Sequence, residues 1–192
     1  MRDIQRAEEC VRELLISLGL DIDDPNLVGT PRRVAKWLAS FTLSEEEVAK
    51  RCEEHGNATF PATADDMVAL EPFLVYSICP HHLLPVQYLV SLAYIPNGKV
   101  TGLSKLVRIS REMAKRPLLQ ETYVPLLADM LVKVLGTEHV AVRVVGTHEC
   151  MKVRGVMCES PTVITALRGA FKTNPSLKQE FYDIVSGGRL RR

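Results

Sequence analysis

The spacing of apolar positions divides the chain into a helical first third and a mixed remainder. Helices are predicted over residues 2–18, over residues 30–41, and again from residue 44. Gly19 is a typical terminator for the first helix, and Thr30 and Pro31 would start the second with a capping hydroxyl followed by proline at the first helical position. Ser44 and Glu47 have the spacing of a capping box, which predicts a third, short helix.

Strands dominate the next part of the chain. Residues 53–64 mix Gly, Asn, Pro and Thr and are expected to connect the two parts, whereas apolar side chains alternate between Val86 and Tyr94 as they do in a strand. The predicted order is strand, strand, helix, helix, strand, strand, over residues 67–78, 86–95, 104–115, 118–136, 139–147 and 161–167, with a last helix over 174–186. Pro125 suggests a break or kink in the second of the paired helices.

Short connections between these elements favour an antiparallel sheet with two helices on one face, so the predicted fold class is α+β. Residues 1–64 would form an N-terminal helical region with its connector, and residues 65–192 the sheet domain.

Composition narrows the classes of function. The chain has 192 residues, 46% of them hydrophobic, which is enough to build a core without disulfides. Lys and Arg total 24 against 23 acidic residues, so no overall field favours nucleic acid or a membrane surface as a partner. No apolar run approaches the ~18–20 residues that span a bilayer. Five widely spaced cysteines and no signal-peptide pattern lead us to expect a soluble, cytoplasmic protein.

Two clusters of sulfur and imidazole side chains follow predicted strands. Cys79 and His82 stand in one, with His81 between them, and His148 and Cys150 form the other. Cys79, His82 and Cys150 are the natural set of three zinc ligands, which would leave an open fourth position as in catalytic sites. His81 and His148 would then carry protons. Two other interpretations remain open at this point: buried cysteines with surface histidines, and a structural zinc.

Basic side chains near predicted helix starts are candidates for binding phosphate. Ser104 opens a predicted helix, and Lys105 and Arg108 share one of its faces. A hydroxyl, an ammonium and a guanidinium at a helix N-terminus suit an oligophosphate. Arg154 follows the second cluster closely, and the same spacing recurs at Arg33 and Lys36. Each pair could instead be part of a solvated helix face.

With these residues in view, the chain resembles type I GTP cyclohydrolase. The resemblance runs from about residue 29 to residue 181 and is carried by six motifs: Gly29-Thr30-Pro31-Arg32-Arg33-Val34-Ala35-Lys36, Cys79-x-His81-His82, Gly102-Leu103-Ser104-Lys105-Leu106, Gln120-Glu121, His148-x-Cys150-Met151 and Arg154-Gly155-Val156. It implies the tunnelling fold (T-fold), β-β-α-α-β-β, with residues 65–192 as its catalytic domain. It also implies a toroidal homodecamer with active sites between subunits.

The resemblance further implies a reaction and a set of roles. GTP and water would give formate and 7,8-dihydroneopterin triphosphate, a step of pterin and tetrahydrofolate biosynthesis. It implies zinc on Cys79, His82 and Cys150. It implies that Glu121, with Gln120 beside it, binds the guanine ring, and that Lys105, Arg108 and Arg154 bind the triphosphate. Arg33 and Lys36 would contribute from a neighbouring subunit. His81 and His148 would be the acid–base groups, and Ser104 would lie near the ribose.

The chain departs from the family pattern at three positions near these motifs. Pro80 stands where the family usually has Glu, and Tyr88 and Ser91 replace a common Gly and His in the following strand. All three zinc-ligand positions are present, so we expect metal binding to survive, while rate or substrate preference could change.

Other functions also fit the sequence. A related enzyme could open GTP but release a different pterin product, or the chain could be an inactive, zinc-bearing binding or assembly subunit. Other enzymes of the tunnelling fold fit less well, because pyruvoyl-tetrahydropterin synthases use three histidines on zinc and the nitrile reductases use a cysteine nucleophile.

Overall fold

The computed structural model describes residues 2–187, which divide into two compact units between Leu43 and Ser44. In the first unit, α1 (Ile4–Ser17) and α2 (Thr30–Ser40) pack against each other. The first helix ends as predicted, with Gly19 at a φ of +78° that a residue with a side chain rarely adopts. The predicted cap of α2 was wrong: Gly29 occupies the cap position, and the Thr30 hydroxyl accepts from the Arg33 guanidinium at 3.2 Å.

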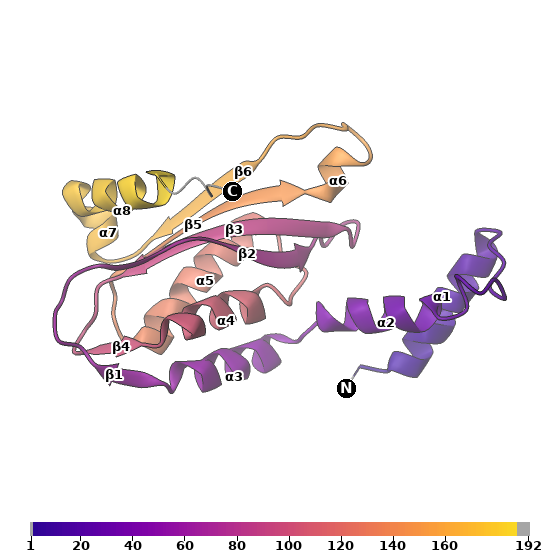
Figure 1. Cartoon of the computed structure of the whole chain (residues 1–192), viewed down its shortest axis with the longest axis horizontal. Helices are drawn as coiled ribbons and strands as arrows, with labels where there is room; N and C mark the ends of the chain where they lie inside the picture. The colour runs from indigo at the N-terminus through magenta and orange to yellow at the C-terminus, as the bar shows by residue number, and fades with distance from the viewer. Residues whose placement is uncertain (1, 188–192) are drawn as a thin grey trace. The chain divides into compact units, whose positions relative to one another are not determined.

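The second unit is built on a four-stranded antiparallel sheet (Figure 1). Its strands lie in the order β2-β3-β5-β6, and their bounds are β2 (Val68–Ile78), β3 (Pro85–Tyr94), β5 (Val140–His148) and β6 (Thr162–Leu167). The two helices that separate β3 from β5 in the sequence are α4 (Leu103–Met113) and α5 (Gln120–Leu135). This arrangement confirms the predicted α+β class and the β-β-α-α-β-β order of the tunnelling fold.

Helices α4 and α5 cover one face of the sheet, as Figure 1 shows. The alternation predicted for β3 is confirmed, because its even-numbered side chains are all buried: Val86, Tyr88, Val90, Leu92 and Tyr94. Helix α3 (Glu45–Gly56) packs against α4 and α5. Its capping box is also confirmed, since the Ser44 hydroxyl accepts from the Glu47 N–H at 3.2 Å and the Glu47 carboxylate accepts from the Ser44 N–H at 2.8 Å.

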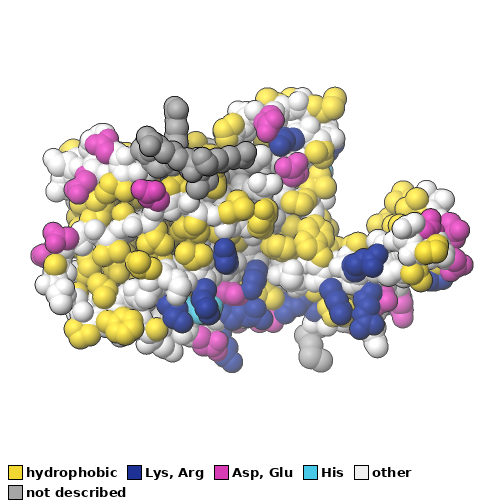
Figure 2. All heavy atoms as spheres, in the orientation of Figure 1, with side chains coloured by type: hydrophobic (Ala, Val, Ile, Leu, Met, Phe, Trp, Pro, Cys, Tyr) yellow, Lys and Arg dark blue, Asp and Glu magenta, His cyan; other side chains and the backbone are white. Residues whose placement is uncertain are grey.

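The other face of the sheet is covered at one end by α7 (Ala170–Thr173) and α8 (Pro175–Gly187) (Figure 1). Phe171, Phe181 and Val185 pack there against Ala93 and Ala141. The sequence predicted helices on one face only, so this second layer is an addition to the prediction. Elsewhere on the surface, large apolar side chains stay exposed, and Figure 2 shows many hydrophobic side chains on the side of this unit in view.

The segment expected to be a connector is more ordered than predicted. Helix α3 continues to Gly56, and β1 (Thr59–Pro61) pairs with β4 (Lys99–Thr101). The boundary expected between residues 64 and 65 stays a prediction about where the catalytic domain begins.

A break or kink was expected at Pro125, but α5 runs unbroken through this residue. Proline cannot donate a hydrogen bond to the carbonyl of Glu121 one turn earlier, but the buried face of α5 holds the helix together. No helix within residues 2–187 combines the length and the apolar character that a membrane span requires.

The Cys52 thiol offers a test of this packing. It lies fully buried on α3, and burial, followed by the charges of Glu112 and Glu53, raises its pKa to about 12. At pH 8 almost none of it is thiolate, the form that reacts with disulfide reagents. We expect Cys52 to react with such a reagent only after denaturation, as measured by thiol counting. In a Cys52→Ala variant, the number of reactive thiols in the native protein should stay unchanged, and the number in the denatured protein should fall by one. A fall in the number for the native protein would contradict this packing.

Candidate active site and metal centre

The turn between β2 and β3 presents the first cluster. The Cys79 N–H donates to the Leu84 carbonyl and the Leu83 N–H donates back to the Cys79 carbonyl, each at 2.8 Å. Leu83 takes a left-handed conformation with a φ of +53°, which closes the loop. Neither bond needs an N–H from Pro80, so the backbone accommodates this departure from the family pattern.

The second cluster reaches the same place because of strand register. His148 is the last residue of β5 and pairs with Val86, near the start of β3. The short helix α6 (Glu149–Lys152), which was not predicted, follows at once and carries Cys150. One ligand atom each from Cys79, His82 and Cys150 thus lies within 4.8 Å of the other two.

These three side chains could hold a metal ion. In a tetrahedral site with Zn–S near 2.3 Å and Zn–N near 2.0–2.1 Å, neighbouring ligand atoms lie about 3.5–3.8 Å apart. The Cys79 Sγ and the His82 Nδ1 are 3.7 Å apart, which matches that spacing. Burial raises the pKa of Cys150, and the neighbouring Cys79 raises it further. A cation bound between the two sulfur atoms would favour the thiolate of Cys150, and sulfur with imidazole nitrogen suits zinc.

Gln120 and His148 form a hydrogen-bonded pair beside the cluster. Gln120 begins α5 and is only 1% exposed. Its amide N–H groups donate to the carbonyls of Val144 at 3.1 Å and Thr162 at 3.0 Å. The amide oxygen therefore faces the His148 Nε2 at 2.9 Å and must accept from it. Neutral His148 then carries its hydrogen on Nε2, which leaves Nδ1 as the nitrogen that can accept a proton.

This pair depends on Gly146, which sequence reasoning missed. A Cβ at position 146 would overlap the Gln120 amide oxygen and lie 3.1 Å from the His148 Nε2. Burial lowers the pKa of His148, opposed by the charge of Glu121, so neutral imidazole is favoured. Gln120 was predicted to bind substrate; because its amide is already engaged, the geometry favours a role in positioning His148.

A pocket of about 170 Å³ opens over these residues. Its walls include six of the predicted site residues: Cys79, His81, Gln120, Glu121, His148 and Cys150. Tyr88 also lines it, so this departure from the family pattern lies within the site. Ser91 lies three residues further along the strand and therefore on the opposite face. Its buried hydroxyl has no hydrogen-bond partner among the described residues.

Arg154 also lies at this end of the sheet. Its guanidinium approaches the His82 Nε2 at 2.9 Å, on the side of the ring away from Cys79. The sequence expectation that a cation stands beside the thiol–imidazole cluster is thus met in the structure by Arg154.

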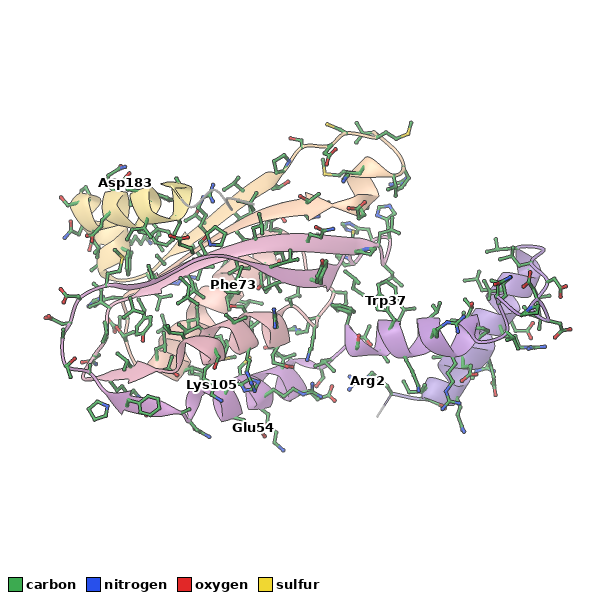
Figure 3. The ribbon with its side chains drawn as sticks, viewed as in Figure 1. Arg2, Trp37, Glu54, Phe73, Lys105 and Asp183 are labelled. Carbon is green, nitrogen blue, oxygen red and sulfur yellow. The ribbon has the colours of Figure 1, made fainter. Side chains whose placement is uncertain are left out.

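Three other predicted phosphate-binding residues, Ser104, Lys105 and Arg108, lie on α4. The Thr101 N–H is 3.4 Å from the Tyr94 hydroxyl, so α4 begins near the end of β3 that is opposite the turn carrying Cys79. Ten residues of strand span about 33 Å. Figures 1 and 3 show the start of α4, where Lys105 is labelled, next to β4 and far from the β2–β3 turn. Ser104, Lys105 and Arg108 therefore lie far along the sheet from the cluster of their own chain, and their contacts with phosphate stay a prediction. Arg33 and Lys36 belong to α2 in the first unit.

Comparison with known proteins identifies the family. The family model described as GTP cyclohydrolase I matches residues 7–186. GTP cyclohydrolase 1 of Hyperthermus butylicus is 38% identical over 190 residues, which cover 99% of this chain and 95% of that protein. The enzyme of the same name from Clostridium perfringens (strain 13 / Type A) is 35% identical over 187 residues, covering 97% of this chain and 100% of the relative.

Among solved structures, the apo form of the archaeosine synthase QueF-Like aligns with a TM-score of 0.41 at 20% identity, covering 55% of this chain and 96% of that one. The match of the family model and the identity to full-length relatives are sufficient: the chain belongs to the GTP cyclohydrolase I family.

Proposed function

We propose that this GTP cyclohydrolase opens the imidazole ring of GTP by hydrolysis, releases C8 as formate and forms 7,8-dihydroneopterin triphosphate, with zinc held by Cys79, His82 and Cys150. The observation that carries the proposal is the convergence of this ligand set with Glu121 and His148 around one pocket. Family membership makes the protein a hydrolase acting on GTP and relates it to pterin and folate biosynthesis.

Guanine recognition is proposed for Glu121. A carboxylate accepts hydrogen bonds from both N1–H and the 2-amino group of guanine, and adenine has no such pair of donors. Glu121 lies in the first turn of α5 and lines the pocket, which supports this role.

Proton transfer is proposed for the two histidines at the pocket. When bound at the cluster, zinc supplies Lewis acidity and can lower the pKa of a water ligand to ~7. His81 is proposed to donate a proton to N7 as the imidazole ring of the purine opens. His148 is proposed to exchange protons through Nδ1 in the later rearrangement of the ribose, because Gln120 engages its Nε2. Ser104 is the second candidate for this later step.

We propose that the working enzyme is a homo-oligomer, a decamer by its resemblance to the family, with sites shared between subunits. The position of α4 supports sharing, because Ser104, Lys105 and Arg108 are too far along the sheet to reach the cluster of their own chain. Arg33 and Lys36 are proposed to come from a neighbouring subunit, and Arg154 is proposed to bind triphosphate at the site of its own chain.

The edges of the sheet also support association. Strands β2 and β6 are the two edges, and among the described residues each pairs on one side only. Leu74 and Tyr76 on β2 and Val163 on β6 are 38%, 51% and 50% exposed. Unpaired edges with exposed apolar side chains favour pairing with another chain, and repeated edge-to-edge pairing generates a ring.

The first prediction concerns the reaction and the metal together. Protein loaded with zinc should turn GTP into formate and dihydroneopterin triphosphate, identified by mass, and should lose this activity on chelation and regain it with zinc. Metal content should be about one ion per chain and should fall in a Cys150→Ala variant. Formate with a different pterin would favour the alternative product, whereas bound metal without turnover would favour the inactive binding subunit.

The second prediction concerns the support of His148. Gly146→Ala should displace Gln120 and His148 and lower kcat by about a hundredfold or more, as expected when an acid–base group loses its position. Formate release measures the effect, and thermal unfolding checks the fold. Thr147→Ala on the opposite face of the same strand is the control and should keep kcat near the wild-type value. An unchanged kcat in Gly146→Ala would contradict the role of this pair.

The third prediction tests the shared site. Lys105→Ala and Glu121→Ala should each be inactive alone, because each removes a group needed at every site. If one site takes these residues from different chains, random co-assembly of the two variants restores about a quarter of the sites. Formate release from co-expressed variants measures this recovery. The control pair is Cys79→Ala with Glu121→Ala. Both residues line the site of one chain, so this pair should show no recovery of formate release. Equal recovery in the two pairs would rule out a shared site.

A further inference from the structure

Tyr88 is held rigidly at the floor of the pocket. Its ring stacks on Tyr123 with centroids 5.0 Å apart and planes 11° from parallel. The ring of His148 meets it edge-on at 6.2 Å. The Tyr123 hydroxyl donates to the carbonyl of Ser110 at 3.0 Å and so anchors the stack to α4. Two rotatable bonds fixed by two aromatic neighbours leave the Tyr88 hydroxyl little freedom to move.

The Tyr88 hydroxyl remains available to a ligand. It makes no hydrogen bond to any residue between 2 and 187, although the whole residue is only 1% exposed. Ser91 has the one fully buried and unpartnered side-chain polar atom in that range, so the Tyr88 oxygen keeps some accessible surface, and the residue lines the pocket. A largely buried hydroxyl without a hydrogen-bond partner is costly unless a ligand satisfies it.

The surroundings of this hydroxyl define what it can do. Burial raises the pKa of Tyr88 well above its usual value, and the nearby Glu121 contributes the next largest effect, followed by Cys79 and Cys150. The phenol therefore stays protonated at neutral pH and acts as a hydrogen-bond donor next to a carboxylate. The same pocket is thus lined by a carboxylate, which accepts hydrogen bonds, and by a phenol, which donates one.

Guanine presents the complementary pattern along one edge. The 2-amino group and N1–H are donors, and O6 beside them is an acceptor. In the proposed function, Glu121 accepts hydrogen bonds from these two donors, and O6 has no partner. Resting on that function, we propose that Tyr88 is a substrate-binding residue whose hydroxyl donates to O6, so that Glu121 and Tyr88 together read the guanine edge.

This proposal also gives the departure at position 88 a chemical meaning. Where the family commonly has glycine there is no side chain to donate, so in this chain the side chain of Tyr88 adds a contact on the base. The contact is made with the bound purine before its imidazole ring opens, so it should act on substrate binding rather than on the chemical step.

The test uses GTP and 6-thioguanosine triphosphate, in which sulfur replaces O6 while N1–H and the 2-amino group remain. Sulfur is a weaker acceptor, so the wild-type enzyme should prefer GTP. In Tyr88→Phe, which keeps the ring stack, kcat/KM for GTP should fall about three- to tenfold through KM, and that for the thio analogue should hardly change. The preference for GTP should therefore shrink. Formate release measures both substrates, and thermal unfolding confirms an intact fold.

Tyr123→Phe is the matched control, because it removes a hydroxyl from the same stack at a structural hydrogen bond. In this variant, the ratio of kcat/KM for GTP to kcat/KM for the thio analogue should equal that of the wild type, even if the stability of the fold decreases. An equal ratio in Tyr88→Phe and wild type would overturn the proposal for Tyr88 alone. A wild-type enzyme that releases no formate from GTP would overturn the proposed function, and this assignment with it.

Discussion

The antiparallel pairing of β3 with β5 is the constraint on which the site depends. It sets His148 opposite Val86, at the end of β3 that follows the Cys79 turn. Side chains alternate between faces along a strand, so a slip of one residue would turn His148 and Gly146 away from α5. Long runs of buried aliphatic residues on both strands oppose such a slip. The packed interior of the sheet thus fixes the positions of the proposed metal ligands at the ends of its strands.

A second constraint is the small polar network at the start of α5. Gln120 satisfies two strand carbonyls and His148 at once, in a position that is almost completely buried. Buried polar groups of this kind are favourable only when every partner is present. The network therefore ties the orientation of a proposed acid–base group to the contact between a helix and two strands. Tyr88 is held in a comparable way by aromatic contacts, so both groups are positioned by the core.

Much of this could be predicted from local patterns. The alternation from Val86 to Tyr94 and the box formed by Ser44 and Glu47 are properties of adjacent residues, and both are confirmed. The three proposed metal ligands were recognised from residue type and spacing, and the structure places them within reach of one ion. The roles proposed for them and for the other site residues stay predictions.

Features that depend on distant contacts were missed. Spacing showed that Lys105 and Arg108 share a helix face but could not show at which end of the sheet that face lies. The engagement of Gln120 depends on the absence of a side chain at Gly146, which no local pattern records. Pro125 predicts a break or kink because helix propensity is a local property, whereas the packing that keeps α5 continuous depends on distant residues.

The contact between Arg154 and His82 links the ligand set to the charge beside it. A guanidinium only donates hydrogen bonds, so a partner nitrogen at 2.9 Å must offer a lone pair, and His82 then keeps its hydrogen on Nδ1. As a metal ligand through Nδ1, neutral His82 would instead carry the hydrogen on Nε2, and two donors would face each other. Ligation by His82 and its pairing with Arg154 therefore exclude one another. Metal binding through Nδ1 of His82 would therefore require the Arg154 guanidinium to turn away from this ring, so the ligand set and the orientation of the neighbouring cation are linked.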